Sequence, residues 1–216
     1  MTVSILSKPQ NGAELAGFAA AISTGSNNSR RSLKGAMASG HESVLEHANY
    51  TFMITGVSRV LLAQLTRHRI ASFTVQSQRY CPLNGDNDPI IPESIQRKPS
   101  AREAYLQVVN GAMTAYRDLL QMGIPEEDAR YCVPQAVTTT VVMTMNAREL
   151  RHFFSLRCCN RAQWEIRELA DAMLAKLKFE DPELFRDAGP GCVRGRCPEG
   201  SRSCGHPRGN LHEDLC

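Results

Sequence analysis

Residues 137–145 are dense in β-branched and other apolar side chains, and this run predicts a buried strand. The next residues change to the pattern of a helix start. Asn146 and Glu149 have the spacing of a capping box, in which two side chains satisfy the first amides of a helix reciprocally. We therefore expect a helix from Asn146 through about Leu156. A buried strand that leads directly into a helix indicates a fold with both kinds of element in its core.

Further helices are predicted by apolar periodicity and by the residues at their ends. The clearest covers residues 101–122, whose apolar side chains form one stripe, and Gly123 ends it. Ser58 is placed to cap a helix that carries the basic residues 67–69 in its last turn. The other predicted helices cover residues 15–22, 125–131 and 161–178.

Two more segments have the pattern of extended chain. Residues 48–55 alternate, with Tyr50, Phe52 and Ile54 on one side, and Gly56 is expected to end this strand. Helices outweigh strands and do not alternate with them regularly, so the predicted class is α+β, with mixed helices and an antiparallel-type sheet. The remaining extended segment is residues 72–80. The predicted loops are residues 25–32 and 81–99.

The length of 216 residues suits one substantial core, so we expect a single domain over residues 1–188 and a Cys-rich tail over 189–216. Hydrophobic residues at 42% and charged residues at 22% are near globular averages. No apolar run is long enough for a membrane span, and Met1–Gln10 does not have the pattern of an export signal. We expect a cytoplasmic protein that does not bind a membrane.

The eight Cys are even in number, but without an export signal they are expected to be reduced. The tail spacing Cys192-x4-Cys197-x6-Cys204-x-His206 offers four zinc ligands. This spacing differs from that of paired zinc knuckles. A tail with free thiols, Cys216 included, and no bound metal is therefore the favoured interpretation, with zinc as the alternative.

The basic residues favour an anion site. Of the 25 basic residues, 20 are Arg and five are Lys, and the guanidinium fork grips phosphate or carboxylate through two bonds. Arg67, His68 and Arg69 are followed by Ser77 and Arg79, the densest polar cluster in the chain. These groups can bind the phosphates of a nucleotide. The simpler explanation for the first three is that they complement the dipole of a helix C-terminus.

The segment RHRIASFTVQS, residues 67–77, fits the pattern R-H-R-x7-S and so resembles the signature of the flavin-dependent thymidylate synthases. Four other blocks are similar to blocks of that family and occur in the same order. Together they extend over about residues 40–190, and the chain is identified as a member of the family. The blocks are His41-Glu42-Ser43 with Glu46-His47, then Gln64, then Asp128-Ala129-Arg130, and then residues 146–169.

The resemblance implies a homotetramer of mixed α/β fold in which each of four active sites is built from several subunits. It implies synthesis of dTMP from dUMP, with 5,10-methylenetetrahydrofolate as carbon donor and with tightly bound FAD, reduced by NADPH, as hydride donor. By the same similarity, FAD would contact Ser43, Arg67, His68, Arg69, Asn146, Arg148 and His152. The nucleotide dUMP would contact Gln64, Arg67, Gln76, Ser77, Arg79, Arg130 and Arg157.

These roles agree with the chemistry of the side chains. Forming a bond at C5 of uracil requires a more nucleophilic ring, and a fixed cation near N3 and O2 stabilises the charge that develops there. Arg157 is our candidate for this catalytic cation. Arg79 and Arg130 would hold the phosphate far from the reacting carbon, so that binding energy there orients the ring.

Some residues depart from the family pattern or have simpler explanations. Val75 stands where many relatives carry an acidic residue, so a contact made by that carboxylate is missing here. The adjacent thiols of Cys158 and Cys159 are interpreted as packing groups and not as a nucleophile. Arg151 is expected to be a solvated partner of Glu149 and neighbouring acids. Activation of Ser77 by His68 is a weaker alternative to a hydrogen-bonding role for the hydroxyl.

Two functions of other classes use the same arginines. One is a non-catalytic module that binds nucleotides or RNA, against which stands the low aromatic content of 6%. The other is a flavin reductase that oxidises NADPH without needing dUMP. We expect no nucleic-acid partner.

Overall fold

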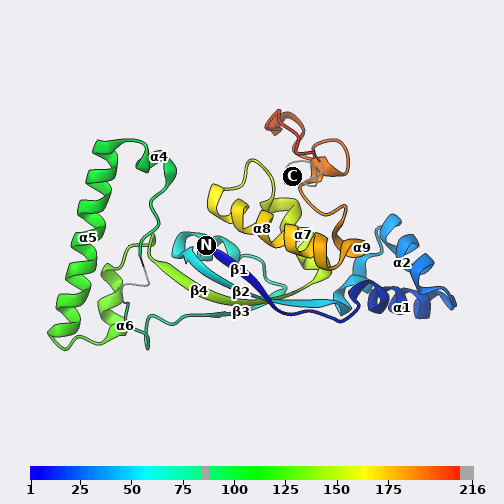
Figure 1. The fold of residues 1–216 in the computed structure, drawn as a ribbon, viewed down its shortest axis with the longest axis horizontal. Coiled ribbons are helices and arrows are strands. Elements are labelled where there is room, and N and C mark those ends of the chain that lie inside the picture. The colour runs from blue at the N-terminus through cyan, green and yellow to red at the C-terminus, as the bar shows by residue number, and fades with distance from the viewer. Residues whose placement is uncertain (84–87, 210–216) are drawn as a thin grey trace. The chain divides into compact units, whose positions relative to one another are not determined.

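The computed structural model describes residues 1–83 and 88–209. Within them, helices are combined with a four-stranded sheet of order β1-β2-β4-β3, which confirms the α+β class (Figure 1). The strands are β1 (Thr2–Ser7), β2 (Asn49–Ser58), β3 (Ala71–Val75) and β4 (Thr138–Asn146). The α-helices are α1 (Gly12–Thr24), α2 (Ser29–Ala38), α3 (Arg59–Leu65), α4 (Glu93–Gln96), α5 (Pro99–Gln121), α6 (Glu126–Ala129), α7 (Ala147–Arg157), α8 (Trp164–Glu180) and α9 (Pro182–Phe185).

The contacts of the chain group it into two compact units. The first unit comprises Met1–Thr2, Ile54–Thr66 and Thr74–Val142. The second comprises Val3–Met53, Arg67–Phe73 and Met143–Cys216, of which residues 210–216 lie outside the described part. The long strands β2 and β4 contribute residues to both units.

Strands β2 and β4 are antiparallel neighbours. The amide of Ala147 donates to the carbonyl of Ala48 over 2.8 Å, and the Thr51 and Thr144 hydroxyls lie 2.9 Å apart. At the other end of the pair, the amide of Arg59 donates to the carbonyl of Val137 over 3.2 Å. Sequence numbers that rise along one strand therefore fall along the other, which is an antiparallel register.

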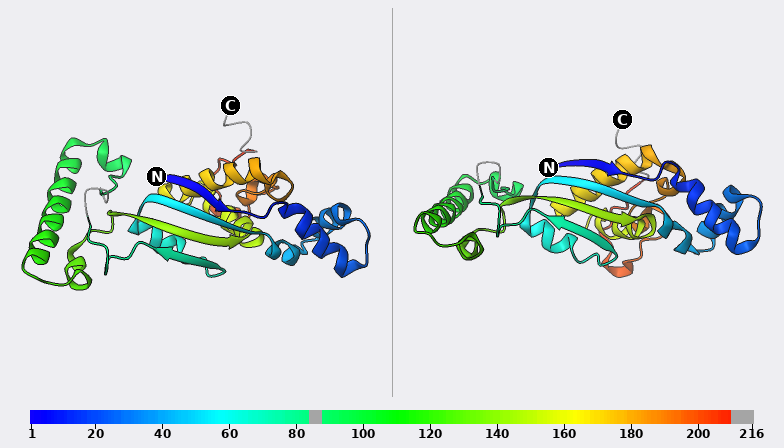
Figure 2. Two further views of the ribbon diagram at one scale, coloured as in Figure 1. Left: turned by 60° about the horizontal axis from the view of Figure 1, so that its bottom comes forward. Right: turned by 90° about the horizontal axis from the view of Figure 1, so that it is seen from below.

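The core of the second unit lies between its strands and the helices α7 and α8, which cover one face of them (Figures 1 and 2). Tyr50 and Phe52 point into this core and are fully buried, as the alternation in the sequence predicts. The rings of Tyr50 and Phe185 meet edge to face with centroids 5.4 Å apart, and Phe154 meets Phe185 at 6.2 Å. The Tyr50 hydroxyl donates to Asp181 over 2.7 Å, so this buried ring satisfies its one polar atom.

Helices α1 and α2 pack closely against each other. A Cβ on Gly17 would lie 2.7 Å from the backbone oxygen of Ser29, so the approach requires glycine in α1. The prediction of a loop over residues 25–32 is wrong in its second half, because Asn28 caps α2. Its side chain accepts from the amide of Arg31 over 2.9 Å.

The first unit contains the long helix α5, close to the predicted bounds. Gly123 follows it with φ of 82°, a conformation that favours glycine and ends the helix. Of the predicted apolar stripe, Val109 and Tyr116 are buried, whereas Val108 is 71% exposed. Residues 81–99, predicted as loop, include α4 and the start of α5, and residues 84–87 lie outside the described part.

The junction of β2 and α3 corrects two predictions. Strand β2 continues through Gly56, which has φ of 68°, and ends at Ser58. The Ser58 hydroxyl accepts from the amide of Leu61 over 3.0 Å, which confirms the predicted cap. Helix α3 ends at Leu65, so residues 67–69 follow the helix and do not form its last turn. Of the predicted extended segment, residues 72–80, only residues 72–75 are strand, as part of β3.

Replacing Phe52 with Ala removes a fully buried ring, and we expect the free energy of unfolding to fall by about 3–5 kcal/mol because a cavity remains. The control is Met53→Ala, one residue along β2 on the opposite face and 37% exposed, which should stay within about 0.5 kcal/mol of wild type. Urea denaturation at one protein concentration measures both. Equal midpoints for the two variants would contradict the assignment of faces.

Candidate functional site

Helix α7 contributes five of the polar side chains that line one cavity of the second unit. The Asn146 side chain accepts from the amide of Glu149 over 2.9 Å and so begins the helix as predicted. The carboxylate of Glu149 lies 3.0 Å from the ring of His68, a contact that the capping box does not predict. Four-residue spacing places Arg148 and His152 on one face of the helix.

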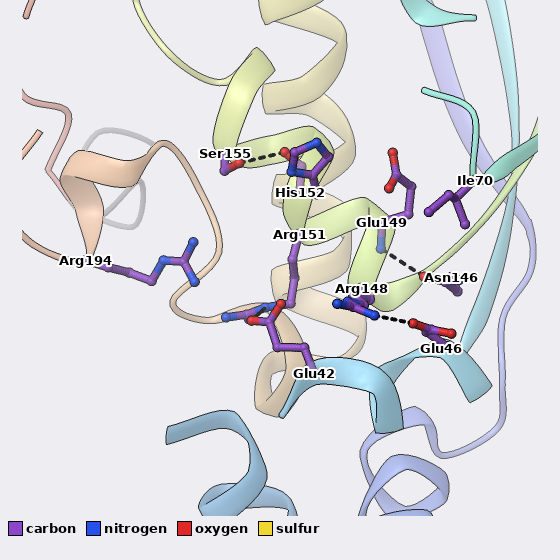
Figure 3. Close-up of a pocket in the computed structure, with 10 residues that line it drawn as sticks. All are labelled: Glu42, Glu46, Ile70, Asn146, Arg148, Glu149, Arg151, His152, Ser155 and Arg194. Atoms are coloured by element: carbon purple, nitrogen blue, oxygen red, sulfur yellow. Dashed lines mark hydrogen bonds and ion pairs between the residues drawn. The ribbon is translucent and has the colours of Figure 1, made fainter. Parts of the chain in front are cut away.

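A cavity of about 480 Å³ lies over this face of α7 (Figure 3). Nine of its ten lining residues are polar or charged, and Ile70 of the signature segment is the apolar one. Arg148 Nη1 lies 2.5 Å from Glu46 Oε1, and the pair is half-exposed. The lining residues are Glu42, Glu46, Ile70, Asn146, Arg148, Glu149, Arg151, His152, Ser155 and Arg194.

Arg151 is buried behind this cavity, so the expectation that it is solvated is wrong. It donates to Asp187 Oδ1 over 2.8 Å, to Asp187 Oδ2 over 3.0 Å and to the carbonyl of Leu184 over 2.6 Å. Its Nε lies 3.7 Å from Glu42. The hydrogen bond from Arg151 holds the pKa of Asp187 below its ordinary value. Arg151 therefore fixes the segment after α9 to α7 through a forked ion pair.

His68 joins Glu149 to Arg157. Its Nδ1 lies 3.0 Å from Glu149 Oε1, and its Nε2 accepts from Arg157 Nε over 3.1 Å. The residue is buried, and its ring meets the Phe153 ring edge to face at 4.9 Å. Burial lowers the pKa of His68 in spite of the hydrogen bond with Glu149, and Arg157 lowers it further. Burial also lowers the pKa of Arg157, and repulsion by Arg67 adds to this.

In the first unit, Glu127 brings together two arginines of the predicted dUMP set. Arg79 Nε lies 3.1 Å from its carboxylate, and Arg130 Nε donates to its backbone carbonyl over 3.1 Å. Burial lowers the pKa of Arg59, and the charge of Arg130 lowers it further, so a third guanidinium lies near. The Ser77 hydroxyl accepts from the amide of Arg79 over 3.1 Å. Gln64 lies in α3, and the amide of Gln76 donates to Thr140 of β4.

The predicted FAD residues all belong to the second unit. Asn146, Arg148 and His152 line the cavity over α7. Ser43 lines a separate cavity of about 580 Å³ among α1, α2 and the following 3-10 helix, Glu42–His47. Arg67 and Arg69 are exposed, and His68 is engaged at both ring nitrogens.

Sequence reasoning missed three residues that shape this region. Glu149 was visible only as a helix cap, and nothing in the sequence paired it with a residue 81 positions away. Asp187 has no local signal. Arg194 lies in the predicted tail, yet it lines the cavity over α7.

The structure describes seven of the eight cysteines and the tail as far as residue 209. Cys158 is fully buried, and burial raises the pKa of its thiol, with Asp171 adding to the effect. Within residues 1–83 and 88–209, no three His, Cys, Asp or Glu side chains gather as ligands for a metal ion. Cys216 lies outside the described residues. In the part of the chain that the structure describes, no helix is both long and apolar enough to cross a membrane.

The chain is similar to known proteins over most of its length. The family model described as "Thymidylate synthase complementing protein" matches residues 4–183. The flavin-dependent thymidylate synthase of Geobacter sulfurreducens is 52% identical over 170 residues, which cover 78% of this chain and 73% of that protein. That of Clostridium tetani is 46% identical over 185 residues, covering 78% and 74%.

A solved structure has a similar fold. It is the flavin-dependent thymidylate synthase ThyX from Helicobacter pylori, complexed with FAD and dUMP. The TM-score is 0.72 and the identity is 28%, with 88% of this chain and 100% of that chain covered.

The ion pair of Arg151 and Asp187 should make stability depend on pH in the acid range. Because the folded state lowers the pKa of Asp187, the pair stabilises fully above the ordinary pKa of about 3.9 and loses this contribution as pH falls below it. We expect Asp187→Asn to be less stable than wild type at pH 7, with a difference that narrows as pH approaches 3. Chemical denaturation across this range measures it. A difference that stays constant with pH would contradict the pair.

Proposed function

The chain belongs to the flavin-dependent thymidylate synthase family, and on that basis we propose that it converts dUMP to dTMP by reductive methylation. In this proposal 5,10-methylenetetrahydrofolate donates the carbon unit, and FAD reduced by NADPH donates the hydride. The observation that carries the proposal is the cavity over α7, because it gathers three residues assigned to FAD by the family resemblance. They are Asn146, Arg148 and His152.

The lining of this cavity suits the phosphates of a dinucleotide. Arg148 and Arg194 bring exposed guanidinium groups to it, and such groups bind phosphate oxygens through two parallel bonds, whereas the guanidinium of Arg151 is already paired with Asp187. The pair of Arg148 with Glu46 is half-exposed, so it contributes little to stability and a phosphate can compete for the guanidinium. FAD, when bound and reduced, supplies the hydride that completes the methyl group.

The other members of the proposed FAD set have different environments. Arg67 and Arg69 are exposed and free to approach an anion. Ser43 offers a hydroxyl from the second cavity. His68 is engaged by its neighbours at both nitrogens, so we assign it a supporting role behind the flavin site.

We propose that Arg79 and Arg130 hold the phosphate of dUMP. Both contact Glu127, and the side chains of Arg79 and Glu127 are about half exposed, at 50% and 51%. An exposed pair of this kind is worth at most about 1 kcal/mol, so a phosphate dianion can displace the carboxylate. Gln64, Gln76 and Ser77 complete the set, together with Arg67 and Arg157. Val75, which has no carboxylate, adds no charge that would oppose the phosphate.

Arg157 is the proposed catalytic residue. Its guanidinium stays protonated at neutral pH even though its pKa is lowered, so it can stabilise negative charge on the pyrimidine. The burial of Cys158 supports a mechanism without a thiolate nucleophile, because its raised pKa keeps the thiol protonated.

We propose further that the protein is a cytoplasmic homotetramer whose active sites draw residues from several subunits. The exposed apolar residues Leu15, Phe18 and Ile22 lie on one face of α1 and are 42–69% exposed, which suits a surface covered by a partner. The boundary between a catalytic domain, residues 1–188, and a tail, 189–216, stays a prediction. So does the absence of a tail-bound metal.

The reaction is tested by an assay for dTMP with dUMP, methylenetetrahydrofolate, NADPH and FAD, each omitted in turn. We expect a yellow protein that forms dTMP only when dUMP, methylenetetrahydrofolate and NADPH are all present, and that needs added FAD only after its flavin has been removed. NADPH oxidation that is independent of dUMP, without release of tritium from C5-labelled dUMP, would indicate a flavin reductase. A colourless protein that takes up no added FAD would instead favour a nucleotide- or RNA-binding module.

The catalytic role of Arg157 is tested by Arg157→Ala. We expect dTMP formation to fall by about 10²-fold or more, as for loss of one electrostatic stabiliser, while the flavin content stays near that of wild type. Cys158→Ser is the control and should retain most activity. Unchanged turnover in Arg157→Ala would remove this residue from the mechanism, and an inactive but folded Cys158→Ser would indicate thiol chemistry.

A further inference from the structure

The contact between Arg157 and His68 fixes where the proton of the His68 ring lies. A guanidinium has only N–H donors, so Nε2 of His68 must accept and cannot carry a proton. The proton of the neutral ring then lies on Nδ1, which faces Glu149 Oε1 at 3.0 Å. The three groups form a chain in which Arg157 donates to His68 and His68 donates to Glu149.

The surroundings of His68 favour this neutral form. The charged and titratable groups that face the ring are Glu149, His152 and Arg157, all from α7, and the Phe153 ring packs against it. Glu149 alone favours the protonated ring, whereas burial, Arg157 and His152 oppose protonation. The side chains of His68 and Glu149 are only 4% and 9% exposed, so water does not compete effectively for these bonds.

We propose that Glu149, acting through His68, is a positioning residue for the Arg157 guanidinium. The bond to His68 uses the Nε–H edge of Arg157 and holds the plane of the group. The Nη groups, whose N–H donors can bind the pyrimidine, then have a fixed orientation. This inference rests on the proposed function, because it assigns His68 and Glu149 a role in orienting the catalytic cation.

The arrangement implies a pH dependence. A second proton on His68 would bind to Nε2, which would then be a donor. It would face the Nε–H donor of Arg157, so the hydrogen bond between the two residues would be lost. The orientation of Arg157 should therefore be lost on the acid side of neutrality, without any loss of the guanidinium charge itself. In Glu149→Gln the negative charge that favours protonation is absent, so the acid limb of kcat/KM for dUMP should move to lower pH.

The sharpest test compares His68→Leu with His68→Gln in the holoenzyme. Leu provides no acceptor for Arg157, and we expect a fall in kcat of roughly 10²-fold, since a small misplacement of a catalytic group has costs of this order. Gln provides a carbonyl oxygen on a chain of similar length and should restore part of the activity. Equal activities of the two variants, with equal flavin content, would overturn the proposal.

A double-mutant cycle isolates the route through Arg157. If His68 acts by positioning Arg157, adding His68→Leu to Arg157→Ala should lower kcat by less than about twofold beyond the single Arg157 variant. Independent, multiplicative losses would overturn the proposal. Wild-type enzyme that forms no dTMP at all would instead contradict the proposed function, so the two failures are distinguishable.

A third measurement observes the His68 ring in the wild-type holoenzyme and needs a folded variant only to assign its signals. With ¹⁵N-labelled histidine, the His68 signals, assigned by their loss in His68→Gln or, if that variant does not fold, in His68→Asn, report which ring nitrogen is protonated. We expect the Nδ1–H tautomer at neutral pH. An Nε2–H tautomer or a doubly protonated ring at pH 7 would overturn the inferred chain of bonds.

Discussion

The pairing of β2 with β4 is the constraint on which the arrangement of α7 depends. The hydrogen bond from the amide of Ala147 to the carbonyl of Ala48 lies at the end of this strand pair. Helix α7 begins at Ala147. The Asn146 cap then sets the direction of the first turn. Because a slip of one strand by one residue would turn its buried side chains to the other face, burial of Tyr50 and Phe52 also secures the position of the helix.

Helix α7 carries buried charges, and each has a partner from another part of the chain. Arg151 pairs with Asp187, and Glu149 pairs with His68. Burying a charge without a partner costs several kcal/mol, so these contacts are requirements of the fold as well as features of the site. The same helix thus gathers a polar cavity on one face while Phe153 and Phe154 pack in the core.

Local signals in the sequence predicted the parts of the fold that depend on neighbouring residues. The Asn146 and Ser58 caps, strand β4 and helix α5 follow from short patterns, and the structure confirms them. The start of helix α2 was missed because the Ser, Asn and Gly of residues 25–32 resemble a loop, and packing of α1 on α2 outweighs that propensity. Gly56 was expected to end β2, but a strand tolerates glycine where its neighbours pair. The burial of Arg151 and the contact of Glu149 with His68 depend on residues far along the chain, which no local pattern encodes.

The contrast between the cysteines governs how this protein responds to thiol reagents. Cys158 is sealed in the core with a raised pKa, whereas Cys81 is exposed. Alkylating agents attack thiolates that they can reach, so among the cysteines of residues 1–83 and 88–209 modification begins at Cys81, while Cys158 is spared as long as the core stays closed. Labelling of Cys158 is accordingly a reporter of core opening.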